Sequence, residues 1–128
     1  DLTSLGFLKK LHKIAEVKAV CGNMDEPELR NVLPIKELLN IGGFTIGLIH
    51  GCGNPAHLLD YVSKEFLNEK KVDAIIFGHS HKAMSSRKNG TLFFNPGSPT
   101  DKVSSDTNSY GIITISDKIE AEIVRING

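Results

Sequence analysis

The sequence lacks an excess of either charge, a long apolar run and a cysteine-rich pattern. Its 15 Lys and Arg residues are balanced by 15 Asp and Glu residues, so no basic field indicates a nucleic-acid or anionic-membrane partner. No apolar run approaches the roughly 18 residues that a membrane span needs. Its two cysteines, Cys21 and Cys52, lack the spacing of a disulfide framework, which predicts a reducing compartment and therefore a cytoplasmic location.

What is present is an ordinary globular composition. The chain has 128 residues, of which 40% are hydrophobic and 23% are charged. This length predicts a single domain over residues 1–128 with a core of its own. No internal repeat or low-complexity tract divides the sequence, and homo-oligomerisation is left open.

The N-terminal part predicts a helix, a short strand and a loop. Apolar residues at helical spacing predict a helix over residues 5–15, with Thr3 or Ser4 as its N-cap. The apolar run 17–22 ends in glycine and predicts a buried strand. In the polar loop 23–34, we expect Asp25 to cap the segment 26–30.

Three turn signals predict β-hairpins in the rest of the chain. Gly42-Gly43 joins two strands over residues 35–51, and Asn89-Gly90 lies in the middle of 82–98. Asp117-Lys118 divides 110–126, where apolar and acidic residues alternate after the turn. Alternation of this kind predicts a strand with one face in water.

A helix and a core strand lie between the first two hairpins. Asn54 is the expected N-cap of a helix that begins with Pro55 at its first helical position and runs to about Lys71. The run 72–78 has no alternation, which is typical of a strand in a sheet covered on both faces. Helices between early strands and hairpins later predict an α/β fold, a sandwich of two mixed sheets flanked by helices.

Polar side chains follow three of the predicted apolar strands, each beside a glycine. Asn23 follows the strand 17–22, His50 follows the second strand of 35–51, and His79 and His81 follow 72–78. Functional crevices of α/β sheets lie at the carboxyl ends of strands, so we expect these side chains to converge. Their imidazoles suit Zn, Mn, Fe or Ni. His12 and His57, on predicted helices, are interpreted as structural residues.

Other residues near these strand ends have two interpretations. Asn23 is either a turn residue or a neutral oxygen ligand. Ser98, in the sequence Asn-Pro-Gly-Ser, lies in a plain turn or in a backbone nest that binds an anion. Cys21 and Cys52 are interpreted as buried small apolar residues.

Five short motifs together resemble the calcineurin-like metallophosphoesterases, in particular their small bacterial and archaeal phosphodiesterases. In order along the chain, they are DLTS (1–4), GNMD (22–25), HG (50–51), GHSH (78–81) and NPGS (95–98). The resemblance implies a metallophosphoesterase-type α/β sandwich and two divalent ions, with manganese favoured over nickel, iron or zinc. It also implies that Asp1 bridges the two ions. Asn23, His50 and His79 would complete the second metal shell, and His81 would ligate the first metal.

The same resemblance implies hydrolysis of a small phosphoester, either a phosphodiester or an activated phosphomonoester. Asn23 and His50 would be catalytic, and Asn23, Gly51 and Ser98 would contact the substrate. One alternative is a non-catalytic protein-interaction scaffold on the same fold, as in a retromer subunit. Another is a structural site for a single metal ion, although such sites prefer four closed Cys or His ligands.

Three departures from the family pattern stand out. The family begins with a strand that ends in Asp-x-His, whereas this sequence begins at the bridging Asp1, so we expect a longer chain that supplies this strand. Met24 stands where many members carry a histidine acid, and Cys52 stands where small phosphodiesterases often carry a second histidine. Both substitutions affect the expected contacts to the substrate.

Overall fold

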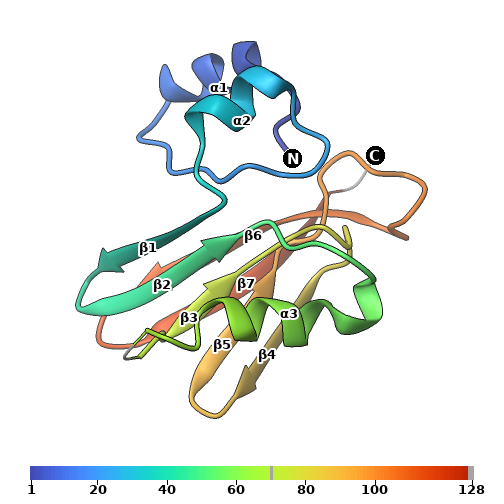
Figure 1. Ribbon diagram of the computed structural model, residues 1–128. Helices are drawn as coiled ribbons and strands as arrows, with labels where there is room; N and C mark the ends of the chain where they lie inside the picture. The colour runs from blue at the N-terminus through green and yellow to red at the C-terminus, as the bar shows by residue number, and fades with distance from the viewer. Residues whose placement is uncertain (70, 127–128) are drawn as a thin grey trace.

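The computed structural model describes residues 1–69 and 71–126 (Figure 1). Helices α1 and α2 lie together on one side of the sheets, and a stretch of chain runs from α2 into β1. The elements, in chain order, are α1 (Leu5–His12), α2 (Pro27–Val32), β1 (Lys36–Ile41), β2 (Phe44–Ile49), the 3₁₀ turn η1 (Pro55–His57), α3 (Leu58–Glu65), β3 (Ala74–Ile76), β4 (Met84–Lys88), β5 (Thr91–Asn95), β6 (Asn108–Ile115) and β7 (Ile119–Ile126).

Five strands form a mixed sheet in the order β1-β2-β3-β5-β4. Strand β3 pairs in parallel with β2 and β5, whereas the outer pairs β1–β2 and β4–β5 are antiparallel hairpins. Strands β6 and β7 form a separate antiparallel pair. The predicted α/β fold is therefore confirmed, while the second sheet is one antiparallel pair and not a mixed sheet.

The large sheet is covered on both faces, as expected for its central strand. On one face, Ile75 and Phe77 pack with Leu58 and Val62 of α3. On the other face, Ala74 belongs to a cluster that includes residues of β6 and β7, among them Ile119. The order of layers is thus helix, sheet and hairpin. No residue before 35 belongs to either buried cluster.

Local turn chemistry determines where the hairpins reverse. Gly42 and Gly43 have φ angles of 57° and 85°, and Asn89 and Gly90 have φ angles of 53° and 81°. Two successive positive φ angles are the requirement of a two-residue type I′ turn, which glycine and asparagine meet at the lowest cost. Both predicted turns are confirmed, and the third hairpin also reverses between Ile115 and Ile119.

The predicted helix starts are largely confirmed, but both helices end early. The Ser4 hydroxyl accepts a hydrogen bond from the Phe7 N–H, and the Asn54 side chain accepts one from the Ala56 N–H. Helix α1 ends at His12 instead of residue 15, and α3 ends at Glu65 instead of Lys71. After each end, backbone N–H groups donate to carbonyls three residues back, a tightening that closes helices.

Two predictions in the N-terminal part are wrong. Residues 17–22 form no strand. The Cys21 N–H donates to the Pro34 carbonyl at 2.8 Å, but proline has no N–H to return, so no ladder develops. Asp25 is not a helix cap: α2 follows Glu26 without a side-chain cap, and the Asp25 carboxylate binds other backbone groups.

Within the part of the chain that the structure describes, no helix has both the length and the apolar character to cross a membrane.

Candidate metal centre

The parallel pairing of β2 and β3 brings two histidine-bearing turns to one edge of the sheet. His50 directly follows β2, and His79 lies three residues after β3. The Gly78 N–H donates to the His50 carbonyl at 3.0 Å, so the two turns are joined through their backbones. Parallel strands place their carboxyl ends at the same edge, and the predicted convergence of these histidines is observed.

The backbone at this edge adopts conformations that most side chains avoid. His79 and His81 have φ angles of 69° and 62°, and Gly51 has a φ angle of 100°. A Cβ at Gly51 would also lie 2.6 Å from the Leu58 Cδ1 atom. Positive φ in a residue other than glycine costs on the order of 1–3 kcal/mol and is concentrated at functional sites. The strained backbone therefore marks this edge as a candidate site.

Four side chains meet at this edge, and we refer to Asp1, Asn23, His50 and His79 as the four-donor cluster. The Asn23 Oδ1 atom lies 2.8 Å from His50 Nε2 and 3.3 Å from His79 Nδ1. The His50 Nε2 atom lies 3.3 Å from the Asp1 Oδ2 atom. The rings of His50 and His79 stand edge to face, with centroids 5.4 Å apart. The Asp1 and His50 side chains are each 9% exposed, whereas Asn23 is exposed and His79 is half-buried, so only the Asp1 and His50 side of the cluster is shielded from water.

Asp25 holds the two N-terminal members of the cluster in place. Its two carboxylate oxygens accept hydrogen bonds from the Thr3 N–H and the Gly22 N–H, each at 2.7 Å. The Met24 N–H donates to Asp1 Oδ1 at 2.7 Å. A Cβ at Gly22 would lie 2.0 Å from the same oxygen, so only glycine leaves room for Asp1. The position of Asp25 just before α2 predicts a cap, whereas its partners, Thr3 and Gly22, both precede it in the chain.

Burial keeps the His50 imidazole neutral. The pKa of His50 is lowered to about 4, chiefly by burial, and the neighbouring His79 lowers it further. The Nε2 atom of this neutral ring faces the Asn23 and Asp1 oxygens and therefore carries the ring proton, which an ion bound at Nε2 would replace.

His81 lies outside the four-donor cluster and binds a residue that sequence reasoning missed. Its Nδ1 atom lies 2.5 Å from the Asp101 Oδ2 atom. Among the described residues, no hydrogen bond or ion pair links His81 to a cluster member. The pKa of Asp101 is lowered to about 2, first by the Val103 N–H and then by the His81 side chain. No sequence motif marks Asp101, because its partner lies 20 residues away across a loop.

A cleft of about 650 Å³ opens beside the cluster. Asp1, His50, His79 and His81 line it, together with apolar residues. The apolar residues are Leu2, Phe7 and Met24 on one wall and Pro96 and Pro99 on the other. A smaller cavity of about 330 Å³ reaches Asn23 and His50 from the side of Arg30, Gly51 and Tyr61. The cluster thus lies between two cavities.

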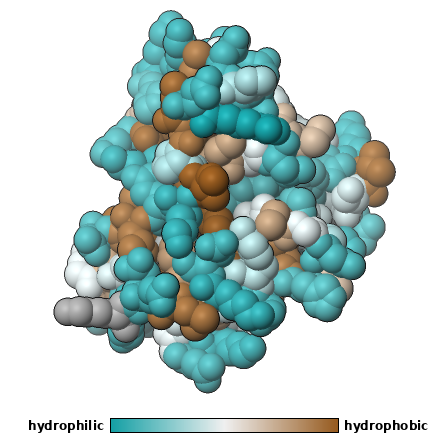
Figure 2. Space-filling view, viewed as in Figure 1, coloured by the Kyte–Doolittle hydropathy of each residue, from teal (hydrophilic) through white to brown (hydrophobic). Residues whose placement is uncertain are grey.

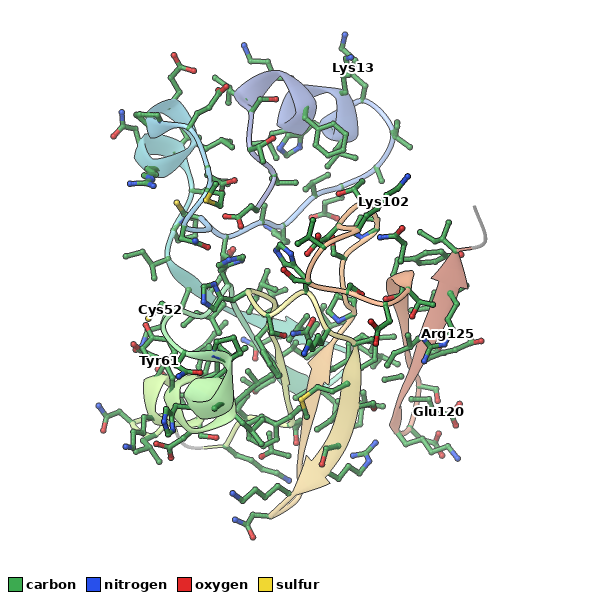
Figure 3. All side chains as sticks on the ribbon, turned by 90° about the vertical axis from the view of Figure 1, so that its right-hand side faces the viewer. Lys13, Cys52, Tyr61, Lys102, Glu120 and Arg125 are labelled. Carbon is green, nitrogen blue, oxygen red and sulfur yellow. The ribbon has the colours of Figure 1, made fainter. Side chains whose placement is uncertain are left out.

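The other residues near the predicted strand ends, Ser98, Gly51 and the two cysteines, line one or the other of these cavities. Ser98 lines the larger cleft, but its hydroxyl already accepts hydrogen bonds from the Thr100 and Asp101 N–H groups at 3.4 Å and 3.1 Å. Gly51 lines the smaller cavity together with both cysteines. Cys52 lies beside Tyr61 near α3 (Figure 3). Cys52 is exposed and Cys21 half-buried, so the interpretation of both as buried residues is wrong.

Comparison with known proteins identifies the family. Residues 1–118 match the calcineurin-like phosphoesterase superfamily domain. The chain belongs to the calcineurin-like phosphoesterase superfamily. The resemblance carried by the five motifs is therefore confirmed.

Relatives of this superfamily member cover nearly all of the chain. A probable metallophosphoesterase of Methanothermobacter thermautotrophicus is 34% identical over 98% of this chain and 72% of its own length. A probable metallophosphoesterase of Methanocaldococcus jannaschii is 36% identical over 98% of this chain. The chain spans 63% of the length of that second relative.

Solved structures show the same fold in proteins of different kinds. Vps29 of Entamoeba histolytica, crystallised with Zn²⁺, has a TM-score of 0.66 and is 27% identical, covering 96% of this chain and 77% of its own. A novel archaeal phosphodiesterase has a TM-score of 0.75 at 21% identity, covering 98% of this chain and 79% of its own. At that identity, the second comparison establishes the fold alone.

The four-donor cluster has the chemistry that the divalent ions of a calcineurin-like phosphoesterase require. The His79 Nε2 atom lies 2.8 Å from the Gly53 carbonyl, so Nε2 carries the proton and the Nδ1 lone pair faces the Asn23 oxygen. Two acceptors that face each other at 3.3 Å suit a cation between them. Counting only His, Cys, Asp and Glu, no three of the described residues are placed to hold an ion. The fit therefore depends on the Asn23 amide oxygen.

Proposed function

We propose that this protein is a metal-dependent phosphoesterase that hydrolyses phosphodiesters or activated phosphomonoesters by two-metal catalysis. The observation that carries the proposal is the convergence of Asp1, Asn23, His50 and His79 beside the cleft. These residues come from four separate segments, and a family of phosphoesterases contains the chain. We further propose a small phosphoester as the substrate, manganese as the preferred metal and a cytoplasmic location.

The cluster residues have distinct roles in this proposal. Asp1 supplies the carboxylate expected to bridge two ions, while His50 and His79 supply neutral nitrogen atoms and Asn23 a neutral oxygen. Bound divalent ions would neutralise the phosphate charge and lower the pKa of a bound water. His81 is the proposed ligand of the first metal. Gly51 lines the smaller cavity and is the proposed backbone contact to the substrate from that side, and Ser98 shapes the loop that forms the far wall of the cleft.

The cleft favours esters with a good leaving group. Met24 lines it and is 69% exposed, but its thioether cannot donate a proton. Where no group protonates the departing oxygen, reactivity depends on how well that oxygen bears negative charge. Aryl esters meet this requirement better than alkyl esters, which is why activated esters enter the proposal.

The test is the hydrolysis of bis(4-nitrophenyl) phosphate with and without Mn²⁺. Hydrolysis should require the ion, and His79→Ala should reduce kcat/KM by orders of magnitude. His12→Ala is the matched control, because His12 is exposed on α1, outside both the cluster and the cleft. Wild-type rates in the His79→Ala protein would contradict the proposal, as would hydrolysis that survives complete chelation.

The second candidate is a protein-interaction scaffold, which the likeness to Vps29 supports. Exposed apolar residues are consistent with a partner: Val32 is 58% exposed and Ile35 is 71% exposed. Figure 2 shows apolar surface between the N-terminal helices and the sheet. This candidate predicts Mn²⁺ binding without turnover on any phosphoester. The presence of all four donors favours the enzyme.

A further inference from the structure

The loop between β5 and β6 presents one carboxylate to His81. Asp101 Oδ2 lies 2.5 Å from His81 Nδ1. The other carboxylate oxygen, Oδ1, accepts hydrogen bonds from the Val103 N–H at 2.8 Å and the Ser104 N–H at 3.2 Å. The Ser104 N–H also lies 3.3 Å from Oδ2. The orientation of this carboxylate is therefore set by the loop backbone as well as by His81.

The loop that carries Asp101 is itself fixed by side-chain hydrogen bonds. The Asp101 N–H donates to the Ser98 hydroxyl at 3.1 Å. The Asn108 amide donates to the Asp101 carbonyl at 2.7 Å and to the Ser98 carbonyl at 3.2 Å. These contacts leave the carboxylate in position independently of His81. A preplaced acceptor of this kind determines which ring nitrogen carries the proton.

His79 and His81 are held through opposite ring nitrogens. His79 binds the Gly53 carbonyl through Nε2, whereas His81 binds Asp101 through Nδ1. Their backbones have nearly the same φ, 69° and 62°. Because the backbone conformation is shared, the partner of each ring decides which nitrogen remains free. In His79 the free atom is Nδ1, and in His81 it is Nε2.

We propose that Asp101 is a positioning residue that holds the His81 imidazole with its proton on Nδ1 and its Nε2 lone pair free for a divalent cation in the cleft. This inference rests on the proposed function. A carboxylate that binds the second nitrogen of a ligand histidine orients the ring and makes it a better donor. Asp101 and His81 both line the cleft, so the pair lies where the ion would bind.

Asp101→Asn gives a sharp test because the loop dictates how the new amide is oriented. The Val103 and Ser104 N–H groups require the amide oxygen at the Oδ1 position. The NH₂ group then faces His81 Nδ1, which must become an acceptor, and the ring proton moves to Nε2. Long-range ¹H–¹⁵N spectra of the metal-free protein should show His81 protonated at Nδ1 in the wild type and at Nε2 in the variant. Asp106→Asn, an exposed position in the same loop, should leave the spectrum unchanged.

The second readout is calorimetry with Mn²⁺ alone. Two Mn²⁺ binding events are expected, one lost in His81→Ala and the other lost in His79→Ala. Asp101→Asn should weaken the first event by about 10–100-fold and should leave the second at its wild-type affinity. Asp101→Glu should restore part of the loss because a carboxylate again accepts the proton. Equal Mn²⁺ affinity in the wild type and Asp101→Asn would contradict the role of Asp101 but not the proposed function. A wild-type His81 ring protonated at Nε2 would have the same meaning. A wild-type protein that binds no Mn²⁺ would contradict this inference and the proposed function together.

Discussion

The N-terminal region, residues 1–34, and the sheet region, residues 36–69 and 71–126, are stabilised by different kinds of contact. The sheet buries its apolar side chains in two clusters, one on each face, and the N-terminal region contributes to neither. That region instead buries Leu8 and Leu29, while Ile14 is 81% exposed. Among the described residues, the hydrogen bonds and ion pairs that join the two regions all end on His50 or His79. The candidate metal centre therefore also supplies the polar contacts between the two regions.

This contrast explains why the donors of the site are unequal. His50 and His79 follow strands of the sheet, whose position is fixed by a hydrophobic core. Asp1 and Asn23 depend on Asp25 and on the fit of the N-terminal region against the two histidines. An ion bound to all four would link the regions, and such a link stabilises the joined state by the free energy of binding.

The largest expected effect comes from removing His50, which contacts both Asp1 and Asn23. His50→Ala should reduce Mn²⁺ affinity more than about 100-fold, which is more than the loss expected when a residue that only orients a ligand is changed. The reason is that a donor is lost together with its contacts to Asn23 and Asp1. Cleavage within residues 1–34 by limited proteolysis should become faster, while cleavage within the sheet should not. His57→Ala, at the exposed start of α3, is the control. Unchanged cleavage in the His50→Ala protein would show that the two regions are held together in another way.

A smaller effect is expected from displacing Asp1 while leaving the sheet intact. In Gly22→Ala, the new methyl group would lie 2.0 Å from Asp1 Oδ1, so Asp1 must move. We expect about a 10–100-fold loss of Mn²⁺ affinity, comparable to a displaced ligand contact, with little change in the melting temperature of the sheet. Gly6→Ala is a matched control, because nothing lies within 4 Å of its Cβ. If Gly22→Ala binds Mn²⁺ as tightly as Gly6→Ala does, Asp1 is not a ligand.

A proton donor on the N-terminal wall of the cleft should produce a more modest effect. Met24→His should accelerate hydrolysis of alkyl phosphodiesters by about tenfold and change nitrophenyl esters little. The gain is below the usual 10²–10⁴-fold of general acid catalysis because position 24 is 69% exposed. A plot of log kcat/KM against leaving-group pKa measures it. A flat plot for the wild type, with chemistry rate-limiting, would mean that another group supplies the proton, and Cys52 and His57 would be examined next.

The last expected effect concerns stability and not catalysis: it is a pH dependence that arises from His50. Its pKa in the folded protein is about 4, against an ordinary value of 6.5. Between these values the unfolded chain binds a proton that the folded protein does not, so the free energy of unfolding decreases as pH falls from 6.5 to 4. Above pH 6.5 the contribution is complete. Urea unfolding of the metal-free protein measures it, and His50→Gln should reduce the slope whereas His12→Ala should preserve it.

Features that depend on neighbouring residues could be predicted from the sequence. Gly42-Gly43 and Asn89-Gly90 form the expected turns because positive φ at two successive positions is a local requirement. The Ser4 cap and the histidines that follow β2 and β3 obey the same logic. For these positions, residue type and spacing were sufficient.

Features that depend on distant partners could not be predicted. The run 17–22 has the composition of a strand, but Pro34 is its backbone partner and cannot complete a ladder. Asp25 resembles a cap, yet its carboxylate binds Thr3, 22 residues away. Asp101 reaches His81 only through the folded loop. In each case the deciding contact joins segments whose proximity is a property of the tertiary structure.

The parallel pairing of β2, β3 and β5 has a consequence for the order of folding. Parallel neighbours cannot form a tight hairpin and need a longer crossover, which for β2 and β3 runs through η1 and α3. Non-local pairing of this kind forms slowly, whereas the three hairpins close early. Donors at positions 1, 23, 50 and 79 come together only after the crossover has closed. A divalent ion should therefore leave the folding rate unchanged and slow unfolding, as expected for contacts absent from the transition state.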